Sequence, residues 1–111
     1  MALKPEAGES WPIRITDREG HPIYLTHERW EHALDHPGMH SGLLRVVLST
    51  VRAGRRKRDT QLSDTFRYLR RVRGLPGNYT HVVVVVKFGY TRTEPPEPNN
   101  FVLTAYLVER R

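Results

Sequence analysis

Four of the six histidines of this 111-residue chain lie within residues 24–40, in the stretch YLTHERWEHALDHPGMH. Histidine exchanges protons near neutral pH, because its ordinary pKa is about 6.5. On a helix, His32 and His36 are four residues apart and share one face, with Glu28 one turn earlier on that face. The spacing favours proton transfer, with Glu28 orienting His32 and His36 supporting the helix end or a substrate.

Two other interpretations of these histidines stay open. His32, His36 and His40, with Asp35 nearby, have the i, i+4, i+8 spacing of a zinc site. The Pro-Gly pair after His36 is expected to end the helix before His40, and the glutamate of an HExxH motif is missing. A structural role is the second alternative, because positive charge is favourable at a helix C-terminus. We expect neither a metal nor a cofactor.

A basic segment, residues 52–73, contains nine arginines and lysines and only two acidic residues, an excess of +7 against +6 for the whole chain. Eight of the nine are arginine, whose planar guanidinium suits phosphate. The segment predicts a nucleic-acid partner, with a merely solvated surface as the alternative. The predicted nucleic-acid-binding residues are Arg55, Arg56, Lys57, Arg58, Arg67, Tyr68, Arg71, Lys87 and His36.

The composition predicts one small domain. We expect residues 1–12 to be a flexible lead-in and residues 13–111 to form a single domain. The chain has no cysteine, which excludes disulfides and thiolate metal sites and is typical of a cytoplasmic protein. No apolar run approaches the ~20 residues of a membrane helix.

The hydrophobic pattern predicts an α+β fold. Strands are expected at 13–16 and 23–25, a helix at 27–36 begun by Thr26, and a second helix from Ser41 to Gly54. Two basic strands, RRKRD and TFRYLRRV, should follow, then the buried strand THVVVVVKF and the final strand FVLTAYLV. We therefore predict an N-terminal hairpin and two helices packed on a curved antiparallel sheet.

Alternation along the strands predicts their faces. On the final strand, Thr104 and Tyr106 should share one face, opposite the apolar set Phe101, Leu103, Ala105 and Leu107. On the central strand, Val82, Val84 and Val86 should lie opposite Val83 and Val85, with Leu44, Val47 and Leu48 of the second helix packed on one of these sets. TFRYLRRV separates Phe66, Tyr68 and Arg70 from Arg67, Leu69 and Arg71, and the sequence does not decide which set faces the site.

The ordered set YLTHERWEHALDHPGM, a second helix, VVVVVKFGY and FVLTAYL resembles the phage-associated nuclease-like proteins of the barnase–EndoU–colicin–RelE (BECR) group. The family's helix histidine falls on His32, its His-Pro pair on His36 and Pro37, the end of its valine strand on Lys87 and its closing motif on Thr104–Tyr106. Gly38 departs from the pattern, since members often carry an acidic residue directly after His-Pro.

The resemblance implies a RelE-like, toxin- or phage-type RNA endonuclease that works without metal and leaves 2′,3′-cyclic phosphate ends. General acid–base catalysis would use His32, with Thr104, Tyr106 and Arg70 at the scissile phosphate. RNA is the expected partner, together with a cognate inhibitor protein. The alternative is a module of the same fold that binds nucleic acid or protein without chemistry.

Overall fold

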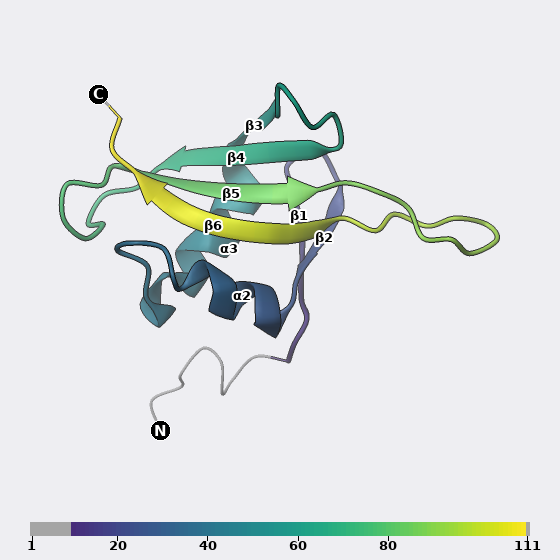
Figure 1. The fold of residues 1–111 in the computed structure, drawn as a ribbon, viewed down its shortest axis with the longest axis horizontal. Helices are drawn as coiled ribbons and strands as arrows, with labels where there is room; N and C mark the ends of the chain where they lie inside the picture. The colour runs from purple at the N-terminus through teal and green to yellow at the C-terminus, as the bar shows by residue number, and fades with distance from the viewer. Residues whose placement is uncertain (1–9, 111) are drawn as a thin grey trace.

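The computed structural model describes residues 10–110, so most of the predicted lead-in lies outside the described residues. The elements in chain order are β1 (Ile13–Thr16), β2 (Pro22–Leu25), α2 (His27–Ala33), a 3-10 turn η1 (Ser41–Leu43), α3 (Leu44–Ala53), β3 (Arg55–Arg58), β4 (Thr65–Arg71), β5 (His81–Lys87) and β6 (Phe101–Val108). The strands form one sheet in the order β1-β2-β6-β5-β4-β3 (Figure 1). The predicted α+β class is confirmed.

The N-terminal hairpin extends the sheet instead of packing on it. β2 runs parallel to β6 and pairs with it at Tyr24 and Phe101, whereas all other neighbouring strands are antiparallel. The Asn100 side chain is buried at this junction and donates to the Pro22 carbonyl at 2.8 Å. The sheet is therefore mixed, and the expectation of a purely antiparallel sheet was wrong.

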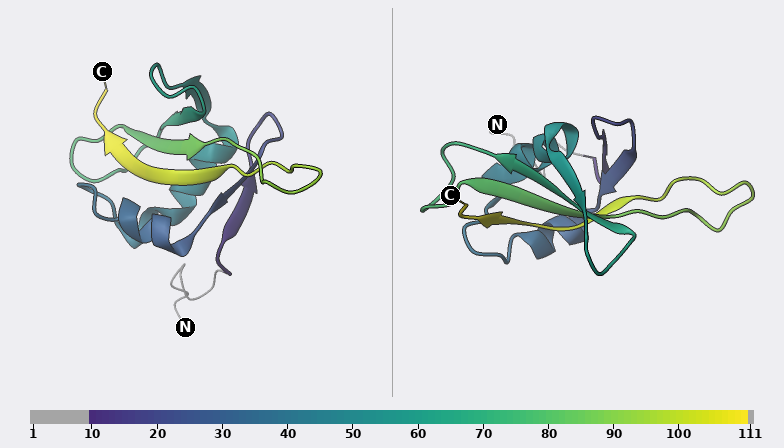
Figure 2. Two further views of the ribbon diagram at one scale, coloured as in Figure 1. Left: turned by 45° about the vertical axis from the view of Figure 1, so that its right-hand side comes forward. Right: turned by 90° about the horizontal axis from the view of Figure 1, so that it is seen from above.

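One face of the sheet is covered by helix α3 and carries the core. Val82, Val84 and Val86 of β5 are buried with Leu44 and Val47 of α3, as the alternation predicted. Figure 1 shows α3 behind the sheet and α2 along the edge of β6, and the two further views in Figure 2 agree. The opposite face, called here the open face, is covered by no helix of residues 10–110.

The final strand departs from simple alternation. Val85 pairs with Thr104, but Val86 pairs with Val102, so the register shifts at Leu103. Such a bulge reverses the faces of the residues beyond it. Val102 therefore joins Ala105 and Leu107 in the core, and the prediction that Phe101 and Leu103 share the buried face was wrong.

Helix α2 begins as predicted and ends early. The Thr26 hydroxyl accepts a hydrogen bond from the Arg29 amide at 3.1 Å, which caps the first turn. The helix ends at Ala33, three residues before the predicted end, because Pro37 has no amide to donate to the Ala33 carbonyl and its ring would clash with that carbonyl. His36 therefore lies in the bend that follows the helix, while Trp30 anchors α2 in the core.

The connection from β5 to β6 projects from the body as a long arm (Figures 1 and 2). A bridge between Tyr90 and Pro98 joins its two sides, with backbone hydrogen bonds from the Thr91 amide to the Glu97 carbonyl and from the Asn99 amide to the Gly89 carbonyl, each at 2.8 Å. Among the described helices, none is long and apolar enough to cross a membrane.

Candidate functional site

The strand register decides which side chains share the open face. Val83 of β5 pairs with Leu69 of β4 on one side and with Tyr106 of β6 on the other. Val85 pairs in the same way with Arg67 and Thr104. Because alternate residues share a face, these residues lie on the face opposite Val84 and the helix. The hydroxyl pair of β6 is therefore on the open face, as predicted.

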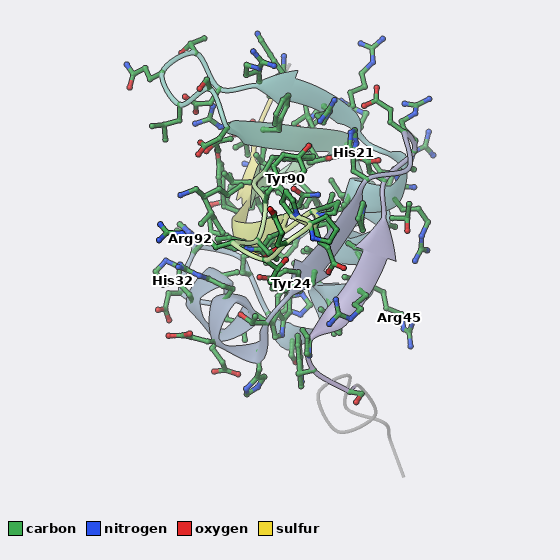
Figure 3. The ribbon with its side chains drawn as sticks, turned by 90° about the vertical axis from the view of Figure 1, so that its right-hand side faces the viewer. His21, Tyr24, His32, Arg45, Tyr90 and Arg92 are labelled. Atoms are coloured by element: carbon green, nitrogen blue, oxygen red, sulfur yellow. The ribbon has the colours of Figure 1, made fainter. Side chains whose placement is uncertain are left out.

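His36 is the histidine that reaches this hydroxyl pair. Its Nε2 lies 3.1 Å from Thr104 Oγ1, within hydrogen-bond distance, and its ring centroid is 5.6 Å from that of Tyr106. His32 is exposed on α2, as Figure 3 shows, and its ring centroid lies 6.3 Å from that of His36. The unwound turn before Pro37 brings His36 to the sheet, so the structure gives His36 the position expected for His32.

Arg67 is the cation beside Tyr106. Hydrogen bonding to the Tyr106 hydroxyl, and the nearby Asp59 carboxylate, raise the pKa of the Arg67 guanidinium. Arg67 also forms an ion pair with Asp59 at 2.7 Å. Arg70 lies on the other face of β4, where its Nη1 donates to Ser49 Oγ of α3 at 2.8 Å. The structure therefore separates Arg70 from Thr104 and Tyr106, and the expectation that it serves there was wrong.

The backbone at position 38, where the chain departs from the pattern of the BECR resemblance, favours glycine. Its φ of +82° lies in the left-handed region that favours glycine. A Cβ atom at this position would lie 2.8 Å from Cε2 of Tyr79 and 3.0 Å from Cδ1 of Leu107. An acidic side chain has no room here, so the chemistry of this site cannot use one directly after His-Pro.

The basic segment is divided between the two faces of the sheet. Arg56 pairs with Tyr68 on the helix-covered side, forms an ion pair with Glu19 at 2.8 Å and lies 4.1 Å from the centroid of the Phe66 ring. Arg58 lies 5.4 Å from the same ring. Arg55 and Lys57 point to the open face instead, because they pair with Leu69 and Arg67.

Tyr68 is not free to stack on a base. It is buried, and its hydroxyl donates to Asp17 Oδ2 at 2.6 Å. Burial and the neighbouring carboxylate both raise the pKa of Tyr68. The structure thus replaces the predicted role of Tyr68 in binding nucleic acid with a buried contact between β4 and the β1–β2 turn.

The Asp17 carboxylate holds that turn. Its oxygens accept hydrogen bonds from the amides of Glu19 and His21 at 3.0 and 2.8 Å, and His21 Nδ1 lies 2.9 Å from Oδ2. Burial acts to raise the pKa of Asp17, but hydrogen bonds from Tyr68 and His21 lower it below its ordinary value. Sequence reasoning missed this cluster, because nothing in the spacing links Asp17 to Tyr68.

Among residues 10–110, Asp17, Glu19 and His21 are the group with the spacing of metal ligands, and the alternative set of His32, His36 and His40 does not form such a group. His40 instead accepts a hydrogen bond from the Gly42 amide at the start of η1. The Asp17 oxygens are already engaged by four donors, so the cluster is explained as a lock on the turn.

A groove of about 820 Å³ runs over the edge strand β3, from the β1–β2 turn to the open face. On the open face it is lined by Arg55, Lys57 and Arg67 over a floor that includes Leu69 and Val83. Positive charge around an apolar floor fits a strand of nucleic acid, whose phosphates need cations and whose bases need flat apolar surface. Lys87, at the other end of β5, lies 4.0 Å from Asp64.

In comparisons with known proteins, no family model, no curated protein and no solved structure matches the chain. The chemistry of the open face is therefore argued from its geometry alone.

Proposed function

We propose that the protein is a metal-independent RNA endonuclease whose reaction centre is formed by His36, Thr104, Tyr106 and Arg67, with His32 beside His36. The observation that carries the proposal is the hydrogen bond of His36 to Thr104, with Tyr106 and Arg67 adjoining, on the basic open face. A proton-exchanging group, a cation and orienting hydroxyls are what cleavage of RNA without metal requires.

In this centre His36 takes the proton from the 2′-hydroxyl of one nucleotide. The 2′-oxygen forms a bond to the phosphorus while the bond from phosphorus to the 5′-oxygen breaks. His32, whose ring centroid is 6.3 Å from that of His36, gives a proton to the departing 5′-oxygen. Thr104 orients His36, and Arg67 balances the charge that develops on the phosphate. The products are a 2′,3′-cyclic phosphate and a 5′-hydroxyl.

The experiment incubates the purified protein with RNA in EDTA and identifies the ends of the fragments. We expect cyclic phosphate ends, and no cleavage where the nucleotide on the 5′ side carries 2′-deoxyribose, because the attacking oxygen is then missing. Cleavage that depends on added metal, or that proceeds at the 2′-deoxy position, would contradict the mechanism. RNA binding without any cleavage would favour the alternative of an inactive binding module.

A further inference from the structure

A second histidine lies on the open face, away from the reaction centre. His81 begins β5 and pairs with Arg71 of β4 and Val108 of β6. Val108 is four residues from Thr104 along β6, which corresponds to about 13 Å at the usual rise per residue. His81 is therefore too far from His36 to join the same proton transfer, and sequence reasoning assigned it no role.

The surroundings of His81 are strongly cationic. A hollow of about 380 Å³ is lined by Arg55, Leu69, Arg70, Arg71, His81 and Arg110, with no carboxylate among these described residues. Arg55, Arg71 and Arg110 have no ion pair with a carboxylate within residues 10–110. Like charges collected without a counterion are costly unless an anion joins them. The hollow therefore has the composition of an anion site.

Hydrogen bonding fixes the histidine in this hollow. His81 Nδ1 lies 2.7 Å from Thr80 Oγ1, and Thr80 is in turn tied to the backbone of Arg110 at 2.9 and 3.2 Å. No hydrogen bond engages Nε2 among the described residues, so this nitrogen remains for a ligand. Burial, followed by the charges of Arg71 and Arg110, lowers the pKa of His81. An anion between these groups would oppose that effect.

The hollow is continuous with the groove over β3, because both are lined by Arg55, Leu69 and Arg110. We propose that His81, Arg71 and Arg110 form a phosphate-binding subsite that holds an internal phosphodiester of the RNA strand, flanking the bond that is cut. The RNA ligand rests on the function proposed above. The anion site itself rests only on the geometry of the hollow.

The first test measures the imidazole signals of His81 by NMR as a function of pH, with and without sodium sulfate. Sulfate is the probe because its charge does not change between pH 5 and 8. The hollow beside His81 is lined by Arg55, Arg70, Arg71 and Arg110, all cations, of which Arg70 donates its Nη1 to Ser49 on the other face, and the Thr80 hydroxyl lies beside the imidazole. Sulfate should raise the titration midpoint of His81, and Arg110→Gln should diminish the rise, whereas the control Arg92→Gln should not. If the titration midpoint of His81 is the same with and without sulfate, the proposed anion subsite is overturned.

The second test measures affinity for an RNA strand whose nucleotides are 2′-deoxy at the cleavage position, so that binding is read without turnover. Arg110→Gln should reduce the salt dependence of binding by about 1 in the slope of log K against log salt. Strands with a 5′-hydroxyl and a 5′-phosphate should bind equally. Unchanged binding by Arg110→Gln, or a 5′-phosphate preference that this variant loses, overturns the internal phosphodiester. Neither readout requires that His36 cleave RNA.

Discussion

The two faces of strands β3 and β4 carry arginines from one basic segment and use them differently. On the helix-covered face, Arg56 forms an ion pair with Glu19 and lies over the Phe66 ring, and Arg70 donates a hydrogen bond to Ser49. On the open face, Arg55 and Arg71 have no ion pair with a described carboxylate; Arg55 lines both the groove and the hollow, and Arg71 lines the hollow. Strand alternation thus places arginines with structural partners on one face, and on the other face it leaves Arg55 and Arg71 for a ligand beside Arg67, which is paired with Asp59.

The largest difference in stability is expected between two variants that place a charge on opposite faces of β5. Val84 is fully buried against the helix-covered face, so Val84→Asp should bury an unpaired carboxylate and unfold the domain. Val85 is half-buried on the open face beside Arg67, so Val85→Asp should still fold. Thermal unfolding followed by circular dichroism measures both variants. Similar melting temperatures for the two would contradict the assignment of the faces.

The next largest effect concerns the histidines of α2 and the bend after it. His36→Gln should lower the rate of RNA cleavage by about 10²–10⁴-fold, the usual contribution of a proton-transfer group. His27→Gln is the matched control, because His27 is an exposed imidazole at the other end of the helix, paired with Glu31. Single-turnover cleavage and melting temperature are measured together. A folded His36→Gln protein that cleaves like the parent would remove the proposed centre.

The contact between the β1–β2 turn and β4 tests whether the polar groups of the helix-covered side stabilise the fold and do not bind RNA. Tyr68→Phe removes the hydroxyl that donates to Asp17 and should cost about 1–3 kcal/mol of unfolding free energy. Urea unfolding at neutral pH measures this loss. RNA affinity should be retained, since Tyr68 is buried on the helix-covered side of β4 and the variant keeps the aromatic ring that lines the groove.

The same contact predicts a pH dependence. The folded-state pKa of Asp17 is lowered, so its stabilisation is present above the ordinary pKa of about 3.9 and is lost as pH falls through the folded value. The parent should therefore lose more unfolding free energy than Asp17→Asn between pH 5 and 3. Urea unfolding at pH 5 and at pH 3 measures this difference. If the parent and Asp17→Asn lost the same unfolding free energy between the two pH values, the role of this carboxylate would be contradicted.

The smallest effect compares two neighbouring arginines of β3. Arg55→Gln should leave stability unchanged and lower the salt slope of RNA binding by about 1. Arg56→Gln should lower the melting temperature, because it removes the ion pair with Glu19 and the contact with Phe66, and should leave the slope unchanged. Fluorescence anisotropy over a series of salt concentrations measures the slope. If Arg56→Gln lowered the salt slope and Arg55→Gln did not, the helix-covered face would be the one that binds RNA.

Much of the fold could be predicted because local patterns determine it. The valine-rich strand was predicted to be buried, and its alternation correctly separated Val82, Val84 and Val86 from Val83 and Val85, although only the structure shows that the first set faces α3. The hydroxyl pair of β6 was also placed correctly relative to Ala105 and Leu107. These features depend on strand periodicity, which is regular from Val82 to Val86 of β5 and from Thr104 to Leu107 of β6.

The site could be predicted only in part, because its details depend on long-range contacts. The bulge at Leu103 arises from the pairing of β6 with β5, and no residue in the sequence of β6 predicts it. The early end of α2 before Pro37 moved the contact with Thr104 from His32 to His36. The choice of Arg67 over Arg70 required knowing which face α3 covers. Each of these differences comes from how elements meet in space.

The central claim, that RNA binds on the open face, is tested most directly by mapping a 2′-deoxy-substituted RNA strand onto the protein by NMR chemical-shift perturbation. We expect the strongest changes at Thr104, Tyr106, Val83 and His81, in one continuous track across β6 and β5. The helix-covered positions, such as Val84 and Leu44, should change little. Perturbations confined to the β5–β6 arm or to the surface of α3 would contradict the account.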